Sequence, residues 1–124
     1  MTTSPEVLII DDVEDARDML AALLRHFGYR TRTACDGYDG LRAVGDGVPD
    51  AIIVDSHMPG MDGGAFIRTL RDMPELPTIP IILLSGDHRA GNTAADAAVL
   101  YLPKPLQVTL LLDTLRALMP SLPS

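Results

Sequence analysis

The sequence has little of what several functional classes require. Its 10 lysines and arginines are outnumbered by 17 aspartates and glutamates, which gives a formal net charge of −7. Nucleic acids and anionic membrane surfaces attract basic patches, so this balance argues against nonspecific binding to either. A single cysteine, Cys35, cannot form an internal disulfide, and the fold therefore needs no oxidising compartment.

Long apolar segments are also missing. Residues 1–6 are polar and lack the basic-then-apolar pattern of a secretory signal peptide. No run approaches the roughly 20 apolar residues of a membrane-spanning helix. Apolar residues still make up 47% of the 124 positions, which is enough for one hydrophobic core. We therefore expect a soluble, cytoplasmic protein with a single domain over residues 1–124 and a core from about residue 6 to residue 119.

The sequence does contain short apolar runs that alternate with helical patterns. Five runs predict strands near residues 7–10, 29–35, 51–54, 79–84 and 99–102. Apolar residues at helical spacing lie between them, at Met19, Leu20, Leu23, Leu24 and Phe27, at Leu41, Ala43 and Val44, at Phe66, Ile67 and Leu70, and from about Gln107 to Met119. This alternation predicts an α/β fold with a parallel sheet covered on both faces.

Polar residues follow these runs at corresponding places. Asp11 and Asp12 follow the first run, Asp55 the third, Ser85 the fourth and Lys104 the fifth. Ligands bind at the carboxyl edge of open α/β sheets, so we expect these side chains to meet there. Neighbouring carboxylates repel one another unless a cation intervenes, and oxygen ligands of this kind suit Mg²⁺. A carboxylate is also a nucleophile toward phosphorus, and Lys104 and Ser85 are donors for phosphoryl oxygens.

Four motifs stand in order at the predicted strand ends: Ile10-Asp11-Asp12, Val54 to Gly63 (VDSHMPGMDG), Leu84-Ser85-Gly86 and Tyr101 to Pro105 (YLPKP). Together they resemble the response-regulator receiver domains of two-component systems, over about residues 7–119. The resemblance implies a flavodoxin-like, doubly wound sheet of five parallel strands in the order 2-1-3-4-5. It also implies a signalling switch rather than an enzyme with a separate substrate. A sensor histidine kinase or a phosphotransfer protein would donate the phosphoryl group, and a downstream protein or effector domain would respond.

The resemblance assigns the phosphoryl group and the metal to particular residues. Asp55 would be the phosphoacceptor. Mg²⁺, with Mn²⁺ as an alternative, would be held by Asp12, Asp55 and the backbone carbonyl of His57, with Asp11 acting largely through water. Lys104 would pair with Asp55 and then with its phosphate.

Further residues would serve switching and the lifetime of the phosphoryl group. Ser85 and Tyr101 would be the moving parts of the switch, and the peptide bond between Lys104 and Pro105 would be cis. His57 and Asp87 lie two residues beyond Asp55 and Ser85. Receiver side chains at these two positions border the path of hydrolytic water, so both are expected to modulate dephosphorylation.

The same residues have plainer interpretations. Asp11 and Asp12 would also suit a helix N-cap, Ser85 with its following glycine a turn, and Tyr101 a strand residue packed against the last helix. A degenerate receiver that binds partners without phosphorylation is the alternative function. A haloacid-dehalogenase-type phosphatase needs a second acid where this sequence has His57. A nucleotide-binding fold is disfavoured because no glycine-rich phosphate loop follows the first strand.

Two segments bear on how the protein meets its partners. The last helix is apolar over more than one face, at Leu106, Val108, Leu110, Leu111, Leu112, Leu115 and Leu118. Either this helix is deeply buried, or part of it is an exposed strip for a partner or for a homodimer. Between Ser85 and Lys104, only Thr93 to Ala98 predicts a helix, of about two turns or fewer, after a mobile stretch from Asp87 to Asn92.

Overall fold

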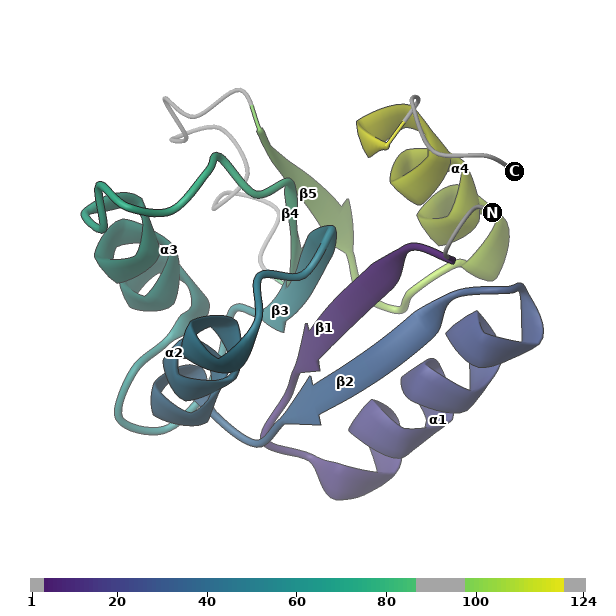
Figure 1. Ribbon diagram of the computed structural model, residues 1–124. Helices are drawn as coiled ribbons and strands as arrows, with labels where there is room; N and C mark the ends of the chain where they lie inside the picture. Colours follow the sequence, from purple (N-terminus) through teal and green to yellow (C-terminus); the bar gives the residue numbers. More distant parts are fainter. Residues whose placement is uncertain (1–3, 87–97, 120–124) are drawn as a thin grey trace.

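The computed structural model describes residues 4–86 and 98–119, which form five strands and four helices. The strands are β1 (Glu6–Ile10), β2 (Arg30–Ala34), β3 (Ala51–Asp55), β4 (Ile81–Ser85) and β5 (Val99–Pro103). The helices are α1 (Glu14–His26), α2 (Gly37–Asp46), α3 (Gly63–Arg71) and α4 (Val108–Leu118). The strands pair in parallel in the order β2-β1-β3-β4-β5 (Figure 1), which confirms the predicted doubly wound sheet.

Each face of the sheet carries its own apolar core. Helices α1 and α4 cover one face, where Leu24 and Leu111 pack with Ile53. Helices α2 and α3 cover the other face (Figure 1), where Phe66 packs with Ile52. Because both faces are covered, the central strands are apolar at consecutive positions rather than at alternate ones.

Helix α2 extends beyond its apolar residues Leu41, Ala43 and Val44, and it includes Gly40, which is a packing position. A Cβ at Gly40 would lie 2.5 Å from Ile10 Cδ1 and 3.0 Å from Phe66 Cε1. Only glycine therefore lets the helix approach β1 and α3 so closely. Asp36 caps the helix by accepting a hydrogen bond from the Asp39 amide at 2.8 Å.

The leucine-rich last helix, α4, combines the two arrangements that its sequence left open. Leu111, Leu112 and Leu115 are buried in the core, whereas Val108 and Leu110 are 40% and 39% exposed. Most of the apolar width of this helix is therefore used for burial, and one short exposed strip is left over.

The apolar face of α1 is narrower than its sequence pattern predicts, because Met19 is 73% exposed. The short helix expected from Thr93 to Ala98 and the mobile stretch before it fall mainly on residues 87–97, outside the described residues. No helix in the described ranges is both long and apolar enough to cross a membrane.

Candidate functional site

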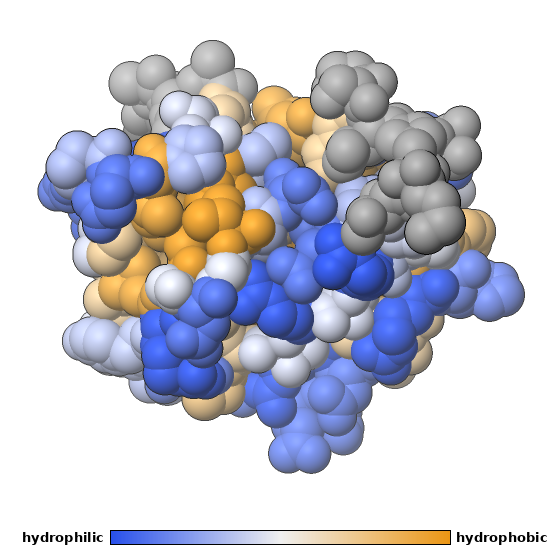
Figure 2. Space-filling view, viewed as in Figure 1, coloured by the Kyte–Doolittle hydropathy of each residue, from blue (hydrophilic) through white to orange (hydrophobic). Residues whose placement is uncertain are grey.

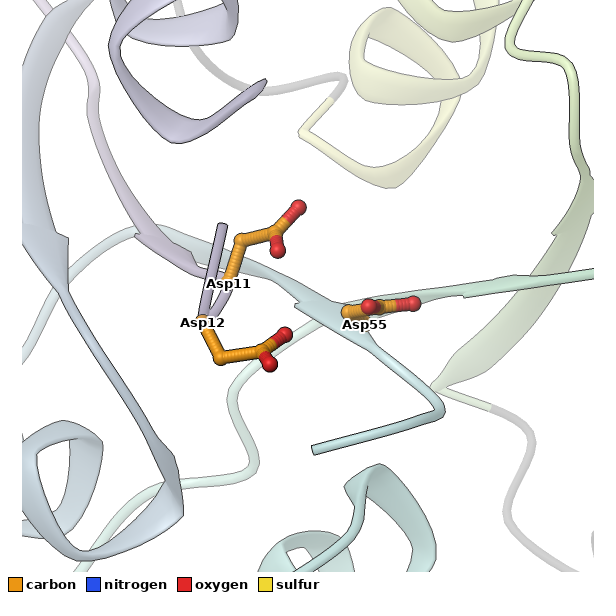
Figure 3. Close-up of side chains that lie close together, drawn as sticks. All are labelled: Asp11, Asp12 and Asp55. Atoms are coloured by element: carbon orange, nitrogen blue, oxygen red, sulfur yellow. The ribbon is translucent and has the colours of Figure 1, made fainter. Parts of the chain in front are cut away.

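Three carboxylates gather at the carboxyl edge of the sheet. Asp11 and Asp12 follow β1, and Asp55 is the last residue of β3, which is the neighbour of β1 in the sheet. One oxygen from each carboxylate lies within 4.8 Å of the other two, and Figure 3 shows the three side chains grouped at these strand ends. Asp11 and Asp55 are buried, whereas Asp12 is exposed. The structure thus brings together the three acids predicted from the sequence.

The backbone around Asp55 is held closely on two sides. The amide of the next residue, Ser56, donates to the carbonyl of Leu84 at 2.9 Å and so continues the pairing with β4. On the other side, a Cβ at Gly63 would lie 2.6 Å from both the Asp55 carbonyl oxygen and Leu83 Cδ1. Gly63 is therefore required where α3 begins against the end of β3. No local sequence pattern reveals this close approach.

Asp11 is tied to the start of α1 by hydrogen bonds. The amide of Val13 donates to Asp11 Oδ1 at 2.9 Å, and Arg17 Nη1 donates to the Asp11 carbonyl oxygen, also at 2.9 Å. Arg17 was not singled out from the sequence, where it looks like an ordinary helix-surface residue. The N-cap of α1 is Val13, without a side-chain capping bond, so Asp11 and Asp12 do not occupy the N-cap position suggested as their plainer role.

Burial is the main reason that the pKa of Asp11 lies above its ordinary value of 3.8. The hydrogen bond from the Val13 amide opposes this rise, while the negative charge of Asp55 adds to it. Charge at this position is therefore costly when the acids stand alone. A cation among the carboxylates would offset part of that cost.

Lys104, the residue after β5, reaches the acids from the end of that strand. Its ammonium lies 2.7 Å from Asp55 Oδ1, and its side chain is 41% exposed, whereas that of Asp55 is 6% exposed. The Lys104 amide also donates to the Ser85 carbonyl at 3.0 Å, and the bond between Lys104 and Pro105 is cis. One strand end thus supplies a cation that contacts the buried acid at another strand end.

Ser85 and Tyr101 lie on the neighbouring strands β4 and β5. Ser85 is buried as the last residue of its strand. Tyr101 is half-buried and packs with the core beneath α2 and α3. The plainer interpretation of Tyr101, packing against the last helix, is therefore wrong, because α4 covers the opposite face.

The two residues expected to influence dephosphorylation differ in what the structure describes. His57 is exposed, two residues beyond Asp55, in the loop between β3 and α3. Asp87 lies outside the described residues.

The donor set fits a hard divalent cation. Three carboxylates offer anionic oxygens within 4.8 Å of one another, and burial raises the pKa of Asp11 among them. Oxygen ligands and partial exposure are what Mg²⁺ requires, since it keeps some of its waters. Asp11, Asp12 and Asp55 are thus suited to such an ion chemically as well as by position.

Comparison with known proteins gives a consistent result. The family model described as "Response regulator receiver domain" matches residues 7–116. The transcriptional regulatory protein PrrA of Mycobacterium tuberculosis is 36% identical over 121 residues, covering 94% of this chain and 51% of PrrA. The response regulator PleD of Caulobacter vibrioides is 34% identical over 122 residues, covering 93% of this chain and 26% of PleD. The chain therefore spans about half of one relative and about a quarter of the other.

The fold has equally similar counterparts among solved structures. The chemotaxis protein CheY4 of Vibrio cholerae superposes with a TM-score of 0.84 at 30% sequence identity. The match covers 94% of this chain and 99% of CheY4. The whole of the described sheet and its helices is therefore an arrangement already known from another protein.

Proposed function

The chain belongs to the response regulator receiver domains, and from this premise we propose that it is a switch activated by phosphorylation of Asp55. The observation that carries the proposal is the contact of 2.7 Å between the Lys104 ammonium and Asp55, a buried acid that lies beside two others. A carboxylate in this position can act as a nucleophile, and the Lys104 ammonium would stabilise the aspartyl phosphate that forms.

The proposed reaction uses two side chains of the protein beside the metal site, the Asp55 carboxylate and the Lys104 ammonium. A carboxylate oxygen of Asp55 attacks the phosphorus, a P–O bond forms, and the bond to the donor breaks. When the donor is a phosphohistidine of a sensor kinase or a phosphotransfer protein, the P–N bond breaks and the imidazole leaves with a proton from solvent. Lys104 balances charge on the phosphoryl oxygens.

Metal binding completes this site in our proposal. Asp12, Asp55 and the backbone carbonyl of His57 would hold Mg²⁺, and Asp11 would act largely through water. The bound ion neutralises charge on the phosphoryl oxygens. The gathering of three carboxylates within 4.8 Å supports this assignment.

Ser85 and Tyr101 are the proposed switch. The hydroxyl of Ser85 would move toward the phosphoryl group, and Tyr101 would turn inward as it does so. Ser85 is the last residue of β4, and Tyr101 lies on the adjacent strand β5 in register with Leu83, two residues before Ser85. His57 would modulate dephosphorylation by obstructing water near Asp55.

The wider setting is also proposed rather than observed. PrrA is named as a transcriptional regulatory protein and PleD as a response regulator. By analogy, this domain would work in the cytoplasm and pass its signal to a downstream protein or an effector domain. Pairing of two chains through α4 remains an expectation, for which Val108 and Leu110 are the exposed apolar residues.

Labelling with a small phosphodonor tests the proposal. Acetyl phosphate with Mg²⁺ is expected to add one phosphoryl group, and mass spectrometry after borohydride reduction is expected to place it on Asp55. Asp55→Asn should stay folded and unlabelled, and chelation of Mg²⁺ should abolish labelling of the wild type. A protein that is folded, binds Mg²⁺ and takes no label would instead be a phosphorylation-independent binding module.

A further inference from the structure

The loop between β3 and α3, residues 56–62, is joined to neighbouring elements by hydrogen bonds only near its ends. The Gly63 amide donates to the Ser56 carbonyl at 3.1 Å, and the Asp62 side chain accepts from the Ala65 amide at 2.8 Å. Within residues 4–86 and 98–119, the middle of the loop, residues 57–60, makes no hydrogen bond to another element, and its one hydrogen bond is internal to the loop, from the Met61 amide to the Pro59 carbonyl at 3.0 Å. Packing must therefore fix the part of the loop that includes His57, and Met58 supplies part of it because it is buried in the core beneath α2 and α3.

Two consecutive loop residues rest on the first two residues of α2. The side chain of Met61 occupies the space in front of Gly37, where an added Cβ would lie 2.7 Å from the sulfur and 3.0 Å from Met61 Cβ. The preceding residue, Gly60, has a φ of +82°, and a Cβ there would lie 3.3 Å from Tyr38 Cε2. The contact is thus close along the whole Met61 side chain and continues into the neighbouring residue.

The support beneath Met61 is itself well fixed. Asp36 caps α2, and Gly40 brings the helix against Ile10, the residue that precedes Asp11. Helix α2 therefore contacts both chain segments that carry proposed metal ligands: the end of β1 and the loop after β3. A side chain that joins the loop to this helix sets the distance between the two segments.

We propose that Met61 is a positioning residue, whose side chain seated on Gly37 fixes the β3–α3 loop and with it the His57 carbonyl at the metal site. The inference rests on the proposed function, because the His57 carbonyl is a ligand only if that function holds. Met61 acts through the loop and contacts neither the metal nor the phosphoryl group. A metal ligand can be held in place by packing as well as by hydrogen bonds from residues around the site. In either case, loosening that support lowers the affinity of the site for the metal.

Comparing two methionines tests this role. Met61 and Met73 are both half-buried against the same core, but Met73 lies after α3, away from the loop. Met61→Ala is expected to raise the apparent dissociation constant for Mg²⁺ by about 10-fold, as loss of outer support does in other metal sites. Met73→Ala should lose comparable thermal stability and keep the wild-type constant. Titration of the full chain with Mg²⁺ alone, followed by amide NMR shifts, gives the constants, and melting curves give the stabilities.

A second pair of variants approaches the same contact from the helix. Gly37→Ala does not change residue 61, but the added Cβ displaces the Met61 side chain. Gly45 lies in the same helix, and a Cβ there meets nothing within 4 Å. Gly37→Ala is expected to weaken Mg²⁺ binding, and Gly45→Ala is not. If the two residues form one contact, Gly37→Ala combined with Met61→Ala will bind Mg²⁺ no more weakly than Met61→Ala alone. Met61→Leu, which refills the space, should restore binding.

Clear results would overturn the proposal. Unchanged Mg²⁺ affinity in both Met61→Ala and Gly37→Ala would refute it, and so would equal weakening by Met61→Ala and Met73→Ala. If Met61→Ala does not fold, Gly37→Ala and Met61→Leu decide. A folded wild type that neither binds Mg²⁺ nor accepts phosphoryl refutes the proposed function and this role together. If the wild type binds Mg²⁺ and accepts the phosphoryl group, and the Met61→Ala and Gly37→Ala variants bind Mg²⁺ equally well, only the role of Met61 is refuted.

Discussion

The Lys104 ammonium lies 2.7 Å from Asp55 Oδ1 and so links the end of β5 to the end of β3 across β4. The two partners differ in environment, since the Asp55 side chain is 6% exposed and that of Lys104 is 41% exposed. An exposed ion pair contributes little to stability, but removing the partner of a buried carboxylate leaves that charge uncompensated. The neighbouring acids Asp11 and Asp12 make this loss more severe.

Lys104→Met therefore provides the first prediction. Without Mg²⁺, the variant should lose about 1–2 kcal/mol of unfolding free energy, because a buried carboxylate loses the half-exposed cation that balances its charge. Saturating Mg²⁺ should restore part of this loss, since the ion balances the same carboxylates. Urea denaturation with and without Mg²⁺ measures both effects. The exposed pair Arg116–Asp113, at 3.3 Å, supplies the control, and Arg116→Met should change stability by less than about 0.5 kcal/mol. Equal losses in the two variants would contradict a special role for Lys104.

The second prediction concerns Asp12, the exposed member of the acid cluster. Asp12→Ala should weaken Mg²⁺ binding and slow labelling of Asp55, yet leave the stability of the metal-free protein unchanged or raised. The reason is that it removes one of three mutually repelling carboxylates at little cost in packing. Thermal unfolding in chelator and an Mg²⁺ titration test the two halves. Asp18→Ala, an exposed acid on α1, should affect neither quantity. A marked loss of metal-free stability in Asp12→Ala would make the cluster structural.

The site was largely predictable because its residues follow strand ends. In a parallel sheet, consecutive strand ends on one edge bring residues 11, 12, 55, 85 and 104 together whatever the loops do between them. The support of the site was not predictable in this way. The contact of Met61 with Gly37 joins a loop to a helix 24 residues away, and no local periodicity reports it. The face that Tyr101 occupies was not predictable for a related reason, because it depends on which helices cover each side of β5.

The third prediction concerns the switch. Phosphorylation of the wild type should shift the ring resonances of Tyr101, because its strand adjoins Ser85 and Asp55 gains charge nearby. Tyr29, a half-buried tyrosine in the core of the other face, should be unaffected and serves as the internal control. Ser85→Ala should still accept the label on Asp55 but show a smaller shift at Tyr101. Identical shifts with and without the Ser85 hydroxyl would remove Ser85 from the switch.

The fourth prediction concerns pH. The pKa of Asp39 lies below its ordinary value of 3.8, mainly because the Arg42 side chain donates a hydrogen bond to its carboxylate, with Nε at 3.0 Å. A hydrogen bond from the Cys35 amide lowers this pKa further. Since the folded pKa is depressed, this stabilisation is present above about pH 4 and is lost as pH falls through the folded value. Asp39→Asn should therefore be slightly less stable than the wild type at pH 7. The difference should shrink in acid, as followed by urea unfolding from pH 7 to pH 2. A difference that stays constant over this range would contradict the assignment.

The last helix shows where sequence patterns stop being informative. Seven apolar residues predicted either deep burial or an exposed strip, and amphipathic periodicity alone did not separate the two. The structure assigns neighbouring leucines to opposite environments: Leu111 is fully buried, and Leu110 is 39% exposed. The boundary lies there because only one side of α4 meets the core that this helix shares with α1. Figure 2 shows that apolar surface is also visible elsewhere on the molecule, so exposure of an apolar residue is not by itself unusual.

This contrast gives the fifth prediction. Leu111→Glu places a carboxylate in the core among Leu24 and Ile53 and should cost more than about 4 kcal/mol, enough to unfold much of the protein. Leu110→Glu adds the same group one residue earlier, where solvent can reach it, and should change the unfolding free energy by less than about 1 kcal/mol. The two variants have the same composition and net charge, so any difference reports position alone. Chemical denaturation at neutral pH measures both values. A large loss in Leu110→Glu would mean that α4 is rotated about its axis relative to the arrangement described, with Leu110 rather than Leu111 facing the sheet.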